Sequence, residues 1–171
     1  MPSLRKPVTP DKALLRLADL CATAERCRHE LQQKLRTWGI APGDAERILQ
    51  KLEEQKFVDD ARFTRAFVHD RITLQKRGRM TVRHDLMLKH IPRDIIDEAL
   101  DAVDEDEYRA NLRAVLRAKL RSLAPRPTPL SRDIRLKLAR HAASRGYEAG
   151  LIFQALDMSE DEDSFAADAI L

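Results

Sequence analysis

The feature that most constrains the fold is a short apolar spacing that occurs three times. An isoleucine is followed four residues later by a leucine in ILQKL, IDEAL and IFQAL, at residues 48–52, 96–100 and 152–156. Residues four apart lie on one face of an α-helix. Recurrence of the same helical anchor at about fifty-residue spacing is typical of an array of helical units.

Each anchor follows a turn and an apolar pair. The turns are Gly39-Ile40, His90-Ile91 and Gly146-Tyr147. The pairs, again four residues apart, are Leu31 and Leu35, Val82 and Leu86, and Leu138 and Ala142. Together these positions predict a three-helix unit that is repeated three times.

The composition agrees with an all-α chain. Of 171 residues, 43% are hydrophobic, 35% are charged and 5% are aromatic, with five glycines. Few β-branched runs occur, and strong helix formers are abundant. We therefore predict nine helices in three tandem three-helix modules, without a sheet, arranged in a line rather than a ball.

Local signals place the helix ends. Thr9 and Pro10 predict the first helix start, Gly39 the end of the second helix, and Asp59 the cap of the fourth, which Gly78 ends. Further helices are predicted near residues 43–56, 80–90, 92–103, 130–145 and 147–157. The predicted division is a flexible arm at 1–10, modules at 11–57, 58–104 and 105–157, and an acidic tail at 158–171 that we expect to be frayed or disordered.

Two similar strings resemble zinc-protease helices but lack a ligand. RHELQQKL and RHDLMLKH start at residues 28 and 83. The zinc motif needs a second histidine one turn after the first, and those positions hold Gln33 and Leu88. The sequence therefore predicts no metal, no cofactor and no catalytic residues.

The remaining sequence signals favour a cytoplasmic protein. No apolar stretch is long enough to span a membrane, and no signal peptide is recognised at the start. Cys21 and Cys27 are six residues apart, which fits neither a CxxC motif nor a paired metal spacing. We expect Cys21 in the core and Cys27 at a helix start, where CRHE imitates a capping box.

Asp70 is predicted to be a buried carboxylate. At regular α-helical angles it falls between Phe67 and Leu74, on the apolar face that also carries Phe63 and Ala66. A buried carboxylate needs a partner, and the expected one is an arginine, such as Arg83, or a nearby backbone amide. No second acid or base is spaced to make Asp70 a catalytic acid.

Charge is strongly segregated along the chain. Residues 61–92 carry eight basic and two acidic side chains, and residues 108–145 carry eleven and one. One predicted basic face comprises Arg62, Arg65, His69 and Lys76; a second comprises Arg109, Arg113, Arg117 and Arg121, which recur every four residues. Like charges at this spacing oppose helix formation, so the line favours a polyanionic or acidic partner over a merely solvated face.

The basic faces do not resemble a sequence-specific nucleic-acid reader. Such readers add base-edge side chains or stacking aromatics to their phosphate contacts. Here the aromatic residues fall at core-type positions instead. Weak binding to a nucleic-acid backbone and docking on an acidic protein groove both remain open.

The repeat resembles the RecX family of bacterial recombinase regulators. The second module carries the DDxRF opening, the glycine break and the IxxAL close; the first carries CRHELQQKL and ILQKLEEQKFVDD; the third carries KLARHAASRGYEAGLIFQAL. The resemblance covers about residues 11–157 and leaves out the acidic tail. His90 stands where the family pattern leads us to expect glycine.

The resemblance implies a curved, elongated, non-enzymatic molecule that binds the groove of the RecA–DNA filament. Such a regulator of recombination, repair and the SOS response suppresses strand exchange, ATP hydrolysis and coprotease action. We expect a monomer. The predicted binding residues are Arg62, Arg65, Lys76, Arg77, Arg79, Arg113, Arg117 and Arg121. A non-specific DNA-binding protein and a generic helical scaffold are the alternatives, and the tail is expected to compete for the basic faces.

Overall fold

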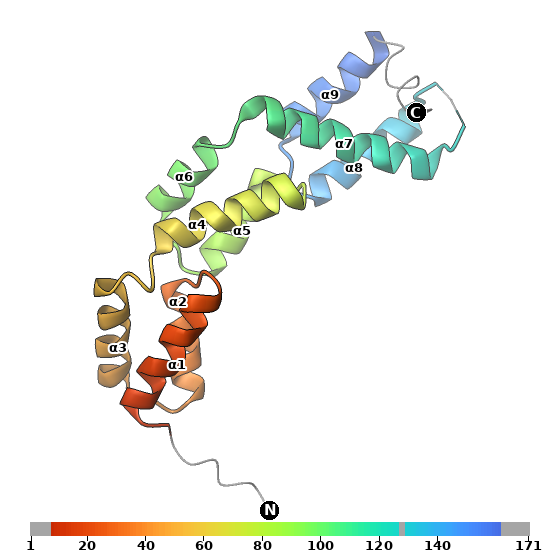
Figure 1. The fold of residues 1–171 in the computed structure, drawn as a ribbon. Helices are drawn as coiled ribbons and strands as arrows, with labels where there is room; N and C mark the ends of the chain where they lie inside the picture. Colours follow the sequence, from red (N-terminus) through yellow and green to blue (C-terminus); the bar gives the residue numbers. More distant parts are fainter. Residues whose placement is uncertain (1–7, 127–128, 162–171) are drawn as a thin grey trace, which may run out of the picture. The chain divides into compact units, whose positions relative to one another are not determined.

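A computed structural model describes residues 8–126 and 129–161. These residues form nine α-helices and one π-helical turn, and they contain no strand. This confirms the all-α prediction. The order, shown in Figure 1, is α1 (Pro10–Thr23), α2 (Arg28–Thr37), α3 (Pro42–Glu54), α4 (Asp60–His69), η1 (Asp70–Leu74), α5 (Arg79–Leu88), α6 (Arg93–Asp101), α7 (Glu105–Leu123), α8 (Arg132–Ser144) and α9 (Ala149–Asp161).

The chain divides into two compact units that do not follow the three predicted modules. The first unit is Met1–Ala66 with Leu86–Asp97, and the second is Phe67–Asp85 with Glu98–Leu171. Helices α4, α5 and α6 each pass from one unit to the other. The module boundaries given above therefore stay a prediction.

The core of the first unit lies among α1, α2 and α3, where α3 packs against both other helices (Figure 1). The apolar residues of these helices recur at helical spacing, so each helix presents one apolar face. The buried cluster comprises Ala13, Leu17, Leu31, Leu35, Ile40, Ala45, Ile48, Leu49, Leu52 and Val58.

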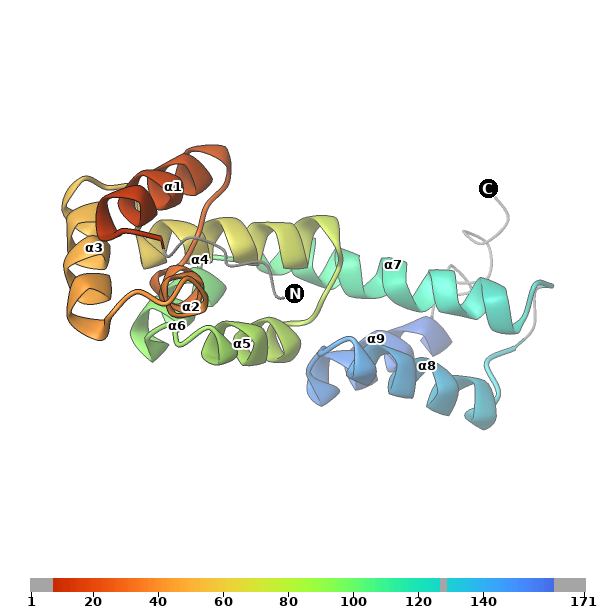
Figure 2. The same ribbon diagram turned by 90° about the horizontal axis from the view of Figure 1, so that it is seen from below.

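The second unit is built on the long helix α7. Helices α8 and α9 pack on α7 and on each other, and η1 also contacts α7; Figure 2 shows α8 and α9 beside α7. One face of α7 is buried against these helices. Its buried residues are Tyr108, Asn111, Leu112, Val115, Leu116 and Leu120.

All six anchor residues are buried, which confirms the repeat as a packing unit. Their exposed fractions are 6% and 0% for Ile48 and Leu52, 0% and 1% for Ile96 and Leu100, and 2% and 4% for Ile152 and Leu156. The six residues of the preceding apolar pairs are all 0% exposed. The repeat therefore marks the same core position three times.

The same turn precedes each anchor helix. Gly39, His90 and Gly146 have φ angles of +74°, +58° and +93°. In each turn the next residue donates its N–H to a carbonyl five residues back, as in a Schellman motif. These bonds run from Ile40 to Leu35 (3.0 Å), from Ile91 to Leu86 (3.2 Å) and from Tyr147 to Ala142 (3.2 Å). The turn keeps its left-handed conformation at His90 although this residue is not glycine.

The prediction that Asp70 is buried is wrong. Asp70 is exposed, and Leu74 is 64% exposed, whereas Ile72 is only 1% exposed. The buried positions along α4 and η1 are Phe63, Thr64, Val68 and Ile72, so the buried face lies to one side of the predicted face and leaves Asp70 out of it. From Asp70 onward a π-helical turn, in which the Gln75 N–H donates to the Asp70 carbonyl at 3.0 Å, inserts one extra residue and rotates Leu74 away from the face that regular α-helical angles predict.

The helix starts are mostly as predicted. The Asp59 carboxylate accepts the N–H of Arg62 at 2.9 Å, which confirms it as the cap of α4. Thr9 and Cys27 occupy N-cap positions, but neither side chain makes a capping hydrogen bond. Cys27 is buried, and Cys21 is only half-buried. Of the predicted tail, residues up to Asp161 belong to α9, and residues 162–171 lie outside the described part of the chain.

Candidate partner-binding surface

The first two candidate cations lie on α4 and differ in their surroundings. Arg62 is tied down within its own unit: its Nε donates to Glu25 at 2.6 Å, and its Nη atoms donate to the Lys56 carbonyl at 3.2 Å. The Glu25 carboxylate raises the pKa of Arg62. Arg65 is exposed, and no ion pair is found for it among the described residues. Arg65 is therefore the more available of the two.

The next pair, Lys76 and Arg77, lies in the loop between η1 and α5. Lys76 has a left-handed backbone, with φ of +51°. Its carbonyl accepts hydrogen bonds from Arg145 Nε at 3.3 Å and from the Tyr147 hydroxyl at 3.1 Å. The side chains of Lys76 and Arg77 are half-buried and have no ion pair in the described residues. The backbone of this loop is fixed while its charges stay available.

Arg79 lies inside a polar cluster of the second unit. Its Nη2 donates to Glu105 at 2.9 Å, its Nη1 lies 3.8 Å from Glu148, and its guanidinium carbon lies 4.1 Å from the Tyr108 ring centre. Its side chain is only 21% exposed. The hydrogen bond from Arg79 lowers the pKa of Glu105. The structure thus gives Arg79 an internal role.

Tyr108 joins that cluster through its hydroxyl group. The hydroxyl donates to Glu148 Oε2 at 2.7 Å and accepts the backbone N–H of Arg79 at 2.9 Å. Burial raises the pKa of Tyr108 above its ordinary value. The hydroxyl therefore acts as a neutral bridge between the start of α5 and the residue before α9.

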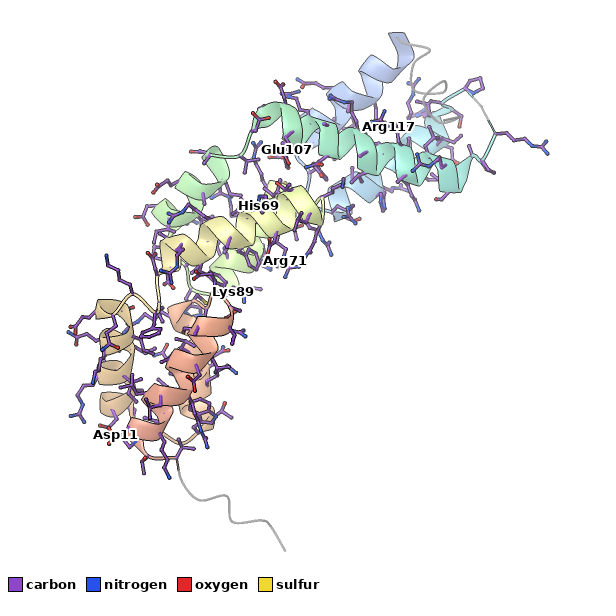
Figure 3. The ribbon with its side chains drawn as sticks, viewed as in Figure 1. Asp11, His69, Arg71, Lys89, Glu107 and Arg117 are labelled. Carbon is purple, nitrogen blue, oxygen red and sulfur yellow. The ribbon has the colours of Figure 1, made fainter. Side chains whose placement is uncertain are left out.

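The predicted line of arginines on α7 is present, but its members differ in exposure and in their contacts within the chain. Arg109 pairs with Glu105 at 3.2 Å and donates to Gln154 at 3.1 Å. Arg113 and Arg121 are exposed, with no ion pair in the described residues. Arg117, labelled on α7 in Figure 3, is half-buried and has a contact within the chain. The exposed positive charge of α7 is thus carried first by Arg113 and Arg121.

A hollow of about 380 Å³ lies in the second unit beside this line. Its apolar floor includes Leu74, which is 64% exposed. Burial, together with Lys119 and Arg145, lowers the pKa of His141 at its edge. None of its eight lining residues is acidic: Leu74, Gln75, Lys76, Ala114, Val115, Ala118, His141 and Arg145.

The hollow is positioned by a contact between the loop at residues 75–78 and Arg145, which the sequence did not predict. Arg145 Nη2 donates to the Gln75 carbonyl at 2.5 Å, and the Gly78 N–H donates to the Arg145 carbonyl at 2.8 Å. A Cβ added to Gly78 would lie 2.0 Å from the carbonyl carbon of Gly146. Gly78 is therefore needed for close backbone approach, and not simply to end a helix as predicted. Only the Arg-Gly pairs at 77–78 and 145–146 hinted at this contact.

No metal-binding cluster is found in the described residues. They hold no group of three or more His, Cys, Asp or Glu side chains able to bind a metal. Burial raises the pKa of both the Cys21 and Cys27 thiols. A search of the described helices for one that is long and apolar enough to cross a membrane finds none.

Comparison with known proteins identifies the family. RecX family models match three segments: the first three-helix domain at residues 13–52, the second at 59–100 and the third at 105–156. A regulatory protein RecX of Prosthecochloris aestuarii is 30% identical over 146 residues, which cover 85% of this chain and 92% of that protein. The chain belongs to the RecX family.

Other RecX proteins support the same conclusion. Regulatory protein RecX of Clostridium tetani is 32% identical over 122 residues, which are 71% of this chain but only 55% of that protein. The crystal structure of RecX from Lactobacillus salivarius matches with a TM-score of 0.79 and 16% identity, covering 90% of this chain and 97% of that one. At this identity the structural match supports the fold alone. The RecX relatives are named regulatory proteins, which agrees with the prediction of a non-enzyme.

Proposed function

We propose that this RecX-family chain binds the groove of the RecA–DNA filament and inhibits ATP hydrolysis, strand exchange and coprotease action by the recombinase. The observation that carries the proposal is the match of three RecX three-helix domains in order along the chain. The proposal places the protein in the cytoplasm, where the filament forms, as a monomer without a cofactor.

The proposed contact residues remain the eight predicted cations, and their surroundings rank them. Arg65, Arg113 and Arg121 are exposed and can approach a partner without breaking an ion pair seen in the described residues. Lys76 and Arg77 follow, because they are half-buried. Arg62, Arg79 and Arg117 have contacts within the chain, so binding through them would require exchange of partners.

The test is the DNA-stimulated ATPase of the cognate RecA. In the triple variant Arg65→Gln, Arg113→Gln and Arg121→Gln, inhibition should weaken while each substitution changes the free energy of unfolding by no more than about 0.5 kcal/mol. The matched control carries three changes on α1, α2 and α3, at Arg16, Lys34 and Lys51, and should inhibit almost normally. Normal inhibition by the first variant with failure of the control would move the binding surface to α1, α2 and α3.

A second candidate is a helical protein that binds DNA directly without sequence preference. It is favoured by residues 108–145, which carry eleven basic and one acidic side chain. Such binding weakens steeply with salt, because each phosphate contact releases counterions. Salt-dependent DNA binding without any effect on RecA would support this candidate against the first.

A further inference from the structure

We propose that the hollow beside α7 is a docking site for this chain's own C-terminal segment, residues 168–171, and that docking there is autoinhibitory. The hollow exists because the two α7 residues Ala114 and Ala118 have small side chains next to the exposed side chain of Leu74. Its size lies within the range typical of ligand sites, about 300–1,000 Å³. An exposed leucine over small neighbours suits an apolar side chain of an incoming segment.

The charge around the hollow selects an acidic occupant. Lys76, His141 and Arg145 line the hollow, and Lys119 is close enough to His141 to lower the pKa of its imidazole. The chain ends in DEDSFAADAIL, which combines several acids with Ile170 and Leu171. Charge complementarity and apolar content therefore fit the same short segment.

The length of the chain after α9 decides which residues of the C-terminal segment can reach the hollow. Arg145, at the edge of the hollow, precedes the start of α9 by four residues, whereas residue 162 follows its end at Asp161. The 13 residues of α9 rise by about 20 Å at 1.5 Å per residue. An extended chain gains about 3.3 Å per residue, so Phe165 reaches only about 13 Å back along α9, while Ile170 reaches about 30 Å.

The geometry thus assigns Ile170 and Leu171 to the apolar floor and Asp168 to the side of Lys76 and Arg145. Docking would cover the hollow next to Arg113 and Arg121, the exposed cations of α7. The regulatory consequence rests on the proposed function, because the covered surface is the proposed partner surface. The docking itself does not depend on that function.

Docking is tested by methyl NMR of the full-length chain. The double variant Ile170→Ser and Leu171→Ser should shift the methyl signals of Leu74, Ala114 and Ala118, and leave those of Leu31 and Leu52 in the first unit unchanged. Phe165→Ser is the matched control and should shift none of them, because Phe165 does not reach. Unchanged signals for Leu74, Ala114 and Ala118 in the double variant overturn the proposal.

The reciprocal variant Ala118→Glu places a carboxylate in the hollow. It should move the amide signals of residues 168–171 in the same direction as 0.5 M salt does, since both weaken the charge-assisted contact. Ala118 is exposed, so the substitution leaves the fold intact. Docking within one chain is overturned if the amide signals of residues 168–171 are unchanged in Ala118→Glu. It is also overturned if their shifts grow with protein concentration.

The autoinhibitory role has its own measurement. If the segment is docked in half of the molecules or more, undocking by the double variant should lower the concentration for half-inhibition of RecA ATPase at least about two-fold. Shifted methyl signals with unchanged inhibition would retain the docking and overturn the regulatory role. Absence of inhibition by the unmodified chain would instead overturn the proposed function.

Discussion

The hydroxyl group of Tyr108 bridges two partners, so its removal should destabilise the fold. Tyr108→Phe leaves the Arg79 N–H and the Glu148 carboxylate without their shared partner at a buried position. We expect the free energy of unfolding in urea to fall by about 1–3 kcal/mol. Tyr147→Phe is the matched control, since that hydroxyl makes one bond, to the Lys76 carbonyl at 3.1 Å. It should cost less, and equal losses would show that the bridging role of Tyr108 is unimportant.

His29 makes stability depend on pH. Its ring stacks on His90 with centroids 4.0 Å apart, and its Nε2 lies 2.9 Å from Gln33 Nε2. Burial lowers the pKa of His29 below its ordinary value, and the positive charges of His90, Arg36 and Lys89 lower it further, against an opposite effect of Glu30. Folding therefore favours the neutral imidazole, and the resulting stability is present above the unfolded-state pKa, about 6.5.

That stability should be lost as the pH falls through the folded-state pKa of His29. We expect the free energy of unfolding to decrease between pH 7.5 and pH 5.5, and to decrease less in His29→Gln. The exposed His84 on α5 provides the control, and His84→Gln should keep the full dependence. His141 contributes in the same direction, because its pKa is also lowered. Equal pH dependence in the unmodified chain and His29→Gln would refute the assignment.

At the scale of elements, the repeated turns are the most informative feature. Gly39→Ala should cost about 1–2 kcal/mol, the penalty of a left-handed backbone, because a Cβ there meets no atom within 4 Å. At Gly146 the Cβ would lie 2.2 Å from Thr81 Oγ1, so Gly146→Ala should add about 1–3 kcal/mol of overpacking. Thermal unfolding of both variants checks the order, and the reverse order would contradict the turn geometry.

These elements also show what the sequence can predict. The anchors and the apolar pairs were predicted because burial repeats at regular helical spacing. Two of the turns were predicted because glycine before an apolar residue ends a helix, and the third, at His90, from its position in the repeat. Asp70 was misplaced because the buried face passes through Thr64 and Val68, outside the predicted apolar face, and Leu74 because no local pattern predicts a π turn. The bonds of Arg79 and of Gly78 could not be derived, since both depend on residues at least 26 positions away in the chain.

At the scale of the whole molecule, charge decides how the chain responds to salt. If Arg65, Arg113 and Arg121 contact DNA phosphates, each replacement by Gln should reduce the slope of log affinity against log salt by about 0.9. Fluorescence anisotropy with a labelled duplex measures that slope. The same experiment with the Arg16, Lys34 and Lys51 control should leave it unchanged. A slope that drops equally in both variants would mean that the whole surface attracts DNA without a defined face.

The contact between Gly78 and Gly146 limits which second-site substitutions can restore stability after Gly78 has been replaced. What a side chain at Gly78 would strike is a peptide group, with the carbonyl carbon of Gly146 at 2.0 Å and the nitrogen of Tyr147 at 2.2 Å. Every amino acid carries that group, so no substitution at position 146 removes the obstacle. A search for second-site suppressors of Gly78→Ala should therefore return substitutions that loosen the packing of α8, and none at position 146.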